Sequence, residues 1–183
     1  MRIISGFHKG RKIQIPKNLP VRPTTDRSKE GLFNILQNSI DFKNIKVIDL
    51  FSGTGSISYE FASRGSKNIS AIDINKQCVK FIQKTSDSLD MEIVVNQVEC
   101  FRFLEKNSMF FDLIFADPPY KFDLENYRKI ILLCKKRLTK KGFLVIEHFK
   151  KINLSEIEGF SYKRGYGNNV FSFFIFNNKK AGR

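Results

Sequence analysis

From Lys46 onward, short apolar runs alternate with longer segments in which apolar residues recur every three or four positions. The first pattern is typical of buried strands, and the second is typical of amphipathic helices. This alternation predicts strands over 46–51, 68–73, 92–97, 112–116 and 142–148. It predicts helices over 56–65, 76–89, 101–104 and 124–138.

Strands that are separated by helices of this length connect through crossovers and form a parallel sheet covered on both faces. The end of the chain departs from this rhythm, because the strand-like segments 160–166 and 170–176 are separated only by Gly167, Asn168 and Asn169. Such a short connection predicts a hairpin. We therefore expect an α/β fold of Rossmann type, with a mostly parallel sheet that ends in an antiparallel strand pair.

The first 43 residues have a pattern of their own. The segment "RIISGFHKGRKIQIP" predicts two short strands joined at 8–10, because apolar residues lie on both sides of a turn that contains glycine. Thr24, Thr25 and Asp26 then offer capping oxygens for a helix with apolar residues at Leu32, Phe33, Leu36 and Ile40. We expect residues 1–43 to form a small hairpin and helix extension and residues 44–183 to form the main domain.

The composition indicates what kind of partner the protein binds. The 183 residues carry a formal net charge of +14, and 42% of them are hydrophobic, which is enough for a real core. Residues 1–43 hold nine Lys or Arg against three acids, so this extension is the expected phosphate-binding surface. An AT-biased coding sequence, which also enriches Ile, Phe and Asn, is the alternative explanation for part of the charge.

Cysteine usage and apolar run lengths bear on the environment of the protein. Cys78, Cys100 and Cys134 lie far apart and show no metal-ligand spacing, so we expect no disulfide and no metal site, and instead buried thiols in a reducing compartment. The chain begins without an apolar stretch of signal-peptide length, and no segment approaches the length that a membrane span needs. We expect a cytoplasmic protein without a membrane partner.

A glycine-containing loop follows the first predicted strand of the main domain. In "VIDLFSGTGSIS", Phe51 to Gly55 connect the strand to the next helix, at the position where glycines let the backbone approach a ligand. Asp49 ends the strand, and a carboxylate there repels a pyrophosphate but attracts a cationic group. The third glycine of a dinucleotide-binding motif is missing.

Further polar residues follow the second and third predicted strands. Asp73, beside Ile74, stands twenty residues after Gly53, where a carboxylate can accept hydrogen bonds from ribose hydroxyls. Glu99 and Cys100 follow the third strand, where they could meet an adenine edge. Tight turns and helix caps are the simpler explanation for each residue alone. Taken together, the residues predict a site for a nucleoside with a cationic tail, which is S-adenosylmethionine.

The run Asp117-Pro118-Pro119-Tyr120 follows the fourth predicted strand. The prolines end the strand pairing and hold the backbone rigid. If Asp117 and the Pro118 carbonyl accept the two hydrogens of an exocyclic amine, the nitrogen lone pair is oriented toward a methyl donor. Tyr120 could stack on a base that has left its helix. These four residues are the predicted catalytic residues, although a proline-rich turn is the simpler reading.

These motifs resemble the RsmD family, class I S-adenosylmethionine-dependent methyltransferases that modify the N2 amine of a guanine in 16S rRNA. The resemblance spans nearly the whole chain and rests on, in order, "MRIISGFHKGRKI", "RPTTDRSKEGLFNIL", "VIDLFSGTGSIS", "DLIFADPPY", "LVIEH" and "RGYGNNVFSFF". It implies a monomer whose substrate is 16S rRNA, which we expect to be bound within an assembled small subunit. It also implies that RNA contacts the extension, at Lys9, Arg11, Lys12, Arg22, Thr24 and Arg27.

Two other functions stay open at this point. An adenine-N6 methyltransferase acting on RNA or DNA would use the same acceptor pair, although the chain has no room for a separate DNA-recognition domain. A non-catalytic RNA-binding factor in ribosome assembly would keep the fold without the reaction. His148 is expected to be structural or to line the substrate site, and His8 is expected to lie in a solvated turn, because the proposed chemistry needs no histidine.

Overall fold

A computed structural model describes residues 1–17, 19, 21 and 24–176 of the chain. It contains a seven-stranded sheet in the order β3-β2-β1-β4-β5-β7-β6. The first five strands are parallel, whereas β7 runs antiparallel to both β5 and β6. The strands are β1 (Lys46–Leu50), β2 (Asn68–Asp73), β3 (Ile93–Gln97), β4 (Phe111–Ala116), β5 (Leu138–Phe149), β6 (Phe160–Tyr166) and β7 (Asn169–Ile175).

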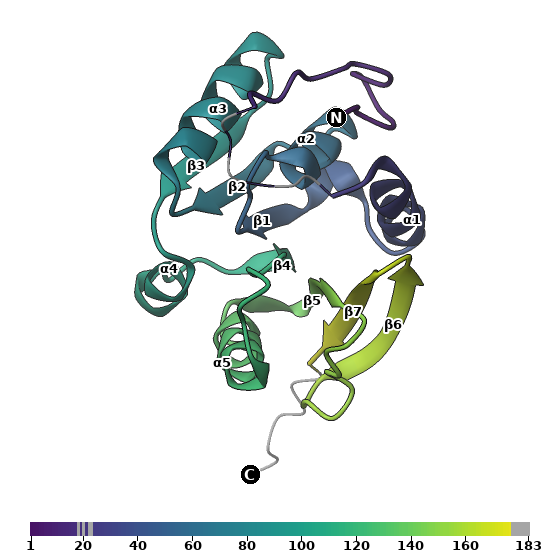
Figure 1. The fold of residues 1–183 in the computed structure, drawn as a ribbon, viewed down its shortest axis with the longest axis vertical. Coiled ribbons are helices and arrows are strands. Elements are labelled where there is room, and N and C mark those ends of the chain that lie inside the picture. The colour runs from purple at the N-terminus through teal and green to yellow at the C-terminus, as the bar shows by residue number, and fades with distance from the viewer. Residues whose placement is uncertain (18, 20, 22–23, 177–183) are drawn as a thin grey trace.

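Helices cover both faces of this sheet (Figure 1), as the alternation of strands and helices predicts. One hydrophobic cluster lies on each face of the sheet. Helices α1, α2 and α3 pack on one face, and α4 and α5 pack on the other. The helices are α1 (Asp26–Leu36), η1 (Phe42–Asn44), α2 (Ser56–Ser63), α3 (Lys76–Ser88), α4 (Cys100–Lys106) and α5 (Leu124–Lys135). The expected Rossmann-type α/β fold with an antiparallel end is confirmed.

The boundary between α5 and β5 differs most from the prediction. The helix expected over 124–138 ends at Lys135, and Leu138 begins β5 instead. Leu138 pairs with Phe111 of β4, and both side chains are buried. Burial against a neighbouring strand therefore ends the helix three residues before its apolar pattern does.

Within residues 1–17, which the structure describes, the expected hairpin is present as a short antiparallel pairing around one isolated bridge between Arg2 and Lys12 and not as two full strands. The chain does turn back at 8–10, with Gly10 at a φ of 82°. The amide of Phe7 donates to the carbonyl of Ser63 at 2.7 Å. The two sides of the turn are joined by backbone hydrogen bonds from the amide of Ile3 to the carbonyl of Arg11 at 3.0 Å and from the amide of Ile13 to the carbonyl of Met1 at 2.9 Å, while the tip of the loop bonds to the end of α2.

A buried ion cluster attaches this extension to the main domain. Lys29 of α1 is 1% exposed, and its ammonium donates to the fully buried Glu60 of α2 at 3.3 Å. Glu60 also accepts from the amide of Ile4 at 2.7 Å and forms an ion pair with Arg64. Because removing one partner would leave a buried charge unpaired, this cluster fixes the extension to α2.

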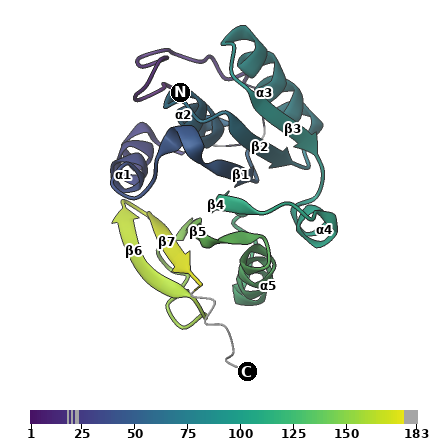
Figure 2. The ribbon, with the colours of Figure 1, turned by 180° about the vertical axis from the view of Figure 1, so that it is seen from behind.

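Helix α1 lies beside the last strands of the sheet in both views (Figures 1 and 2). Tyr166, at the end of β6, packs so closely on Gly31 of α1 that a Cβ there would lie 2.1 Å from the tyrosine ring. The absence of a side chain at Gly31 therefore allows α1 to reach β6. No helix in the described part of the chain is long and apolar enough to cross a membrane.

Candidate active site

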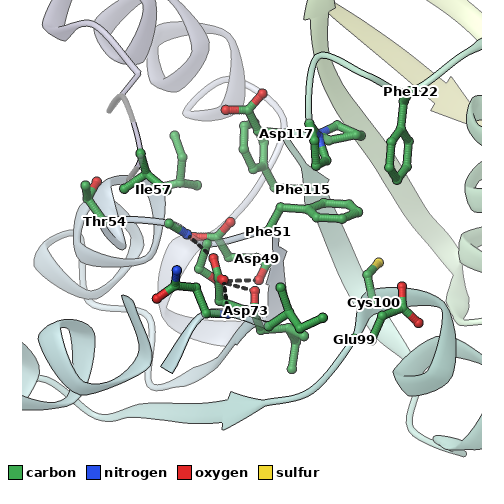
Figure 3. Close-up of a pocket in the computed structure, with 18 of the residues that line it drawn as sticks. Asp49, Phe51, Thr54, Ile57, Asp73, Glu99, Cys100, Phe115, Asp117 and Phe122 are labelled. Carbon is green, nitrogen blue, oxygen red and sulfur yellow. Dashed lines mark hydrogen bonds between the residues drawn. The ribbon is translucent and has the colours of Figure 1, made fainter. Parts of the chain in front are cut away.

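A cavity of about 520 Å³ opens at the carboxyl ends of the parallel strands. Side chains from the loops after β1, β2, β3 and β4 surround it, and Figure 3 shows Asp73 and Glu99 on one side of the view and Asp117 on the other. This is the position at which open α/β sheets bind ligands. The predicted residues that line it are Asp49, Phe51, Ser52, Gly53, Thr54, Asp73, Ile74, Glu99, Cys100, Asp117, Pro118, Pro119 and Tyr120.

Asp49 is the second-last residue of β1, and it is 2% exposed. Its Oδ2 accepts hydrogen bonds from the hydroxyl of Ser58 at 2.7 Å and from the amide of Ser58 at 3.2 Å. Burial raises the pKa of this carboxyl to about 7, against the lowering effect of those hydrogen bonds. Asp49 therefore does cap α2, and it also presents a carboxylate to the cavity.

The glycine loop is held by the carboxylate at the end of β2. Asp73 accepts from the amide of Gly53 at 2.7 Å through Oδ2 and from the amide of Asn75 at 2.7 Å through Oδ1 (Figure 3). Gly53 has a φ of 54°, in the left-handed region that favours glycine. Each oxygen keeps a second lone pair, so the carboxylate can accept further hydrogen bonds from a ligand.

Gly55 has a different role from the one expected. It does not line the cavity but occupies the N-cap position of α2 with a φ of 76°. A Cβ at this position would lie 2.9 Å from the ring of Tyr59. The glycine is therefore needed for the turn and for close packing of the helix.

Glu99 and Cys100 form the wall on the β3 side. Glu99 caps α4, because its two carboxylate oxygens accept from the amides of Phe101 and Arg102 at 2.9 and 2.8 Å. Phe101 stacks on Phe122 with ring centroids 5.8 Å apart, and both rings line the cavity. The wall thus combines a negative edge with an aromatic surface that suits a flat heterocycle.

The run after β4 forms the opposite wall. Asp117 faces the cavity, and among the described residues none donates a hydrogen bond to its carboxylate. Burial and the nearby carboxylates of Glu147 and Asp49 raise its pKa well above the ordinary value. Pro118 is buried and Tyr120 is 67% exposed at the mouth. The acid is thus held inside and the aromatic ring outside.

The sequence analysis missed Glu147 of β5. It is 2% exposed and accepts hydrogen bonds from the hydroxyl of Thr24 at 3.0 Å and from the side-chain amide of Asn169. Burial raises its pKa, and these two hydrogen bonds lower it. An acid in the middle of an apolar strand was the signal available in the sequence.

Apolar residues of the cavity were missed as well. They share no motif and reach the site from five separate segments; they are Val21, Ile57, Ile72, Val98, Phe101, Phe115 and Phe122. Hydrophobic side chains in strands and helices are predicted as core, so only their position in space marks them as ligand-facing.

The predicted RNA-binding residues are dispersed. Lys9, Arg11 and Lys12 are exposed on the N-terminal loop, which contacts Ser63 at the last residue of α2. Ser56, the first residue of α2, lines the cavity, so this loop lies about 10 Å away along the helix. The remaining predicted residues are Arg27, exposed on α1, Thr24, which lines the cavity itself, and Arg22, which lies outside the described residues.

His148 is buried directly after Glu147. Its Nδ1 lies 2.9 Å from the carbonyl of Phe149, and its Nε2 lies 2.8 Å from the hydroxyl of Ser172. Both ring nitrogens are engaged, and burial lowers the pKa of the ring. The expected structural role fits these contacts. The described residues contain no group of three or more His, Cys, Asp or Glu that could hold a metal ion.

Comparisons with known proteins agree with the geometry. Residues 1–175 match a family model described as Conserved hypothetical protein 95. The ribosomal RNA small subunit methyltransferase D of Haemophilus influenzae is 34% identical over 82% of this chain and 79% of its own length.

Solved structures share the fold. A hypothetical protein of Thermus thermophilus superposes with a TM-score of 0.82 at 22% identity, over 96% of this chain and 99% of its own. The 16S rRNA N2 G1207 methyltransferase of the same species, in complex with AdoMet and guanosine, has a TM-score of 0.70 at 17% identity, over 83% of this chain and 43% of its own.

Proposed function

The chain belongs to the Conserved hypothetical protein 95 family, that of ribosomal RNA small subunit methyltransferase D, and on this premise we propose which methyl transfer it performs. It takes the methyl group of S-adenosylmethionine and places it on the exocyclic N2 amine of a guanine in 16S rRNA. The observation that carries the proposal is the shared cavity: Asp49, Asp73 and Glu99 line it together with Asp117.

The cavity suits S-adenosylmethionine. Its volume of about 520 Å³ lies in the range of pockets for ligands of this size. Carboxylates line several of its walls, which favours a ligand with cationic groups over a dinucleotide with a pyrophosphate. When bound, this cofactor supplies a methyl group activated by a positively charged sulfur.

Separate residues would hold the parts of the cofactor. Asp49 would bind the amino group of the methionine moiety, and Asp73 would accept hydrogen bonds from the ribose hydroxyls. Glu99 and Phe101 would face the adenine, the first as an acceptor and the second as an apolar surface. The hydrogen bonds that already fix Asp73 and Glu99 to backbone amides keep these carboxylates oriented for binding.

Asp117 and the carbonyl of Pro118 would accept the two hydrogens of the guanine amine. This removes the nitrogen lone pair from conjugation with the ring and directs it at the methyl group. The nitrogen would become positively charged as its lone pair bonds to the methyl carbon, while the bond from that carbon to sulfur breaks and the demethylated cofactor leaves with that electron pair; one proton would then leave the nitrogen. Asp117 is the nearest acceptor for that proton, and the neighbouring carboxylates increase its basicity.

The substrate assignment draws on the relatives. The Haemophilus influenzae protein is named for the small ribosomal subunit, and the basic surface of this chain suits RNA. We expect an assembled or partly assembled small subunit as the substrate, and a monomeric enzyme acting on it.

The test is transfer of labelled methyl from S-adenosylmethionine to unmodified small subunits, naked 16S rRNA and DNA, followed by nucleoside analysis. We expect N2-methylguanosine in the RNA. N6-methyladenosine would keep the mechanism and overturn the substrate. Tight RNA binding without any transfer would identify a non-catalytic assembly factor.

A further inference from the structure

Two aromatic rings lie in contact at the rim of the cavity. Tyr120 follows β4, and Phe149 is the last residue of β5. Their ring centroids are 4.4 Å apart, and the ring planes are inclined by 34°. Although they touch, Tyr120 is 67% exposed and Phe149 is 36% exposed. Contiguous apolar surface left open to water commonly marks a binding surface.

Phe149 is held rigidly by its backbone. Its carbonyl accepts from the amide of Ile152 at 3.0 Å and lies 2.9 Å from Nδ1 of His148. The amide of Lys150 donates to the carbonyl of Asn168 in the β6–β7 turn at 3.0 Å. These contacts fix the turn that begins at Phe149, so the ring is pre-organised for a ligand.

Basic residues surround this aromatic pair. Lys121 lines the mouth of the cavity beside Tyr120, and Lys150 and Lys151 form the exposed turn directly after Phe149. Aromatic rings interleaved with cations are the features that bind single-stranded nucleic acid, through base stacking and phosphate contacts. An acidic protein partner would use the lysines but would gain little from an exposed phenylalanine face.

We propose that Phe149, Lys150 and Lys151 form a binding site for the nucleotide next to the methylated one. A base that enters the cavity leaves its neighbour without a stacking partner. Phe149 supplies that partner at the rim, and the two lysines bind the adjoining phosphates. This Phe149 site lies by the cavity itself, unlike the N-terminal loop, and it rests on the proposed function because its ligand is the RNA substrate.

A pair of matched substitutions tests the ring. Phe149→Leu removes the aromatic face of this ring. As a control, Phe110→Leu makes the same change at a phenylalanine that is 54% exposed and directly precedes β4, at the opposite end of β4 from Tyr120. We expect Phe149→Leu to raise the KM for RNA by about five- to 150-fold, as for loss of one stacked base. The Kd for S-adenosylmethionine and the KM of Phe110→Leu should stay at the wild-type values.

Stacking can be observed directly, since the chain contains no tryptophan. Phe149→Trp introduces a single indole at the rim. We expect naked 16S rRNA and small subunits to quench its fluorescence, and the same indole introduced by Phe110→Trp to keep its intensity. Unchanged fluorescence with both naked 16S rRNA and small subunits would overturn the proposal.

The lysines have a matched control in the strand that precedes their turn. Lys150→Gln with Lys151→Gln should lower the slope of log Kd for RNA against log salt by about 1.4, because each phosphate contact to a single strand contributes about 0.7. Lys140→Gln with Lys141→Gln, an exposed pair near the start of β5, should leave the slope unchanged. Equal slopes for the two double variants would overturn the proposal.

Different results would contradict the Phe149 site and the proposed function. If the wild-type protein methylates RNA while Phe149→Leu behaves as Phe110→Leu, the Phe149 site is wrong and the proposed function stands. If the wild-type protein transfers no methyl group to RNA or subunits, the proposed function fails and the Phe149 site falls with it.

Discussion

The hydroxyl of Thr24 donates a hydrogen bond to Oε2 of Glu147 at 3.0 Å and joins residues that lie 123 positions apart in the sequence. Thr24 precedes α1 in the extension, and Glu147 lies in β5 beside the catalytic wall. The contact connects the basic N-terminal segment to a buried carboxylate that acts electrostatically on Asp117. The extension therefore contributes to the candidate active site as well as being a candidate RNA surface.

Thr24→Val keeps the shape of the side chain and removes this donor. Because Glu147 is buried, we expect the free energy of unfolding to fall by about 1–3 kcal/mol. Urea unfolding of the whole chain measures this loss, and Thr24→Ser should restore most of it. Equal stabilities of Thr24→Val and the wild type would show that Glu147 does not depend on the hydroxyl.

Asp117→Ala removes the acceptor for the amine. We expect kcat for RNA methylation to fall at least about 100-fold, the usual cost of losing a group that stabilises the transition state, with the Kd for S-adenosylmethionine nearly unchanged. Asp117→Asn keeps one acceptor oxygen and should lose less. Glu125→Ala, an exposed acid of α5, serves as the control. Parallel loss of transfer and cofactor binding in Asp117→Ala would contradict the division of roles.

Asp73→Ala should act on the cofactor. The variant loses the acceptor for the ribose and the hydrogen bond that holds Gly53, so we expect the Kd for S-adenosylmethionine, measured by calorimetry, to rise at least about tenfold. Asp87→Ala changes an exposed carboxylate of α3 and should have no effect. A normal Kd for Asp73→Ala would move the ribose site elsewhere.

Cofactor affinity should depend on pH through Asp49. Its pKa is raised to about 7, and only the ionised form attracts the cationic amino group. We expect the Kd for S-adenosylmethionine to rise about tenfold as the pH falls from 8 to 6. Asp49→Asn should bind more weakly at pH 8 and should lose this pH dependence. The same slope in both proteins would assign the titration to another group.

The raised pKa of Asp49 also affects the stability of the protein without cofactor. Cofactor affinity should increase with pH, whereas the stability contribution of Asp49 should decrease with pH. Between pH 4 and pH 7 the folded state holds a proton on Asp49 that the unfolded state has released. The contribution of Asp49 to the free energy of unfolding is therefore largest below about pH 4 and is lost as the pH rises through about 7. Asp49→Asn should flatten that part of the stability profile in urea unfolding.

The basic side chains of the N-terminal loop should attract RNA through long-range electrostatic interactions. Arg11→Gln with Lys12→Gln should raise the KM for RNA and reduce its salt dependence, because both side chains are exposed. Adding Arg22→Gln should extend the effect. The pair Lys140→Gln and Lys141→Gln removes the same charge elsewhere. If both sets of variants changed KM equally, net charge and not this loop would explain RNA binding.

The sequence by itself determined the alternation of strands and helices and the polar residues at the strand ends. Periodicity is a property of near neighbours, so Asp49, Asp73, Glu99 and Asp117 could be placed at one edge of the sheet before any coordinates. Their meeting around one cavity follows from parallel topology, because parallel strands end at the same edge. Their chemical roles stay predictions until the variants are measured.

Only the tertiary structure decided the contacts between distant segments. The bond from Thr24 to Glu147 and the ring contact from Tyr120 to Phe149 depend on how the extension and the loops after β4 and β5 pack. The N-terminal loop likewise bonds to the end of α2, through the amide of Phe7 and the carbonyl of Ser63. Long-range packing sets these partners because each is chosen by burial and by the need to satisfy buried polar groups, which a local pattern does not encode.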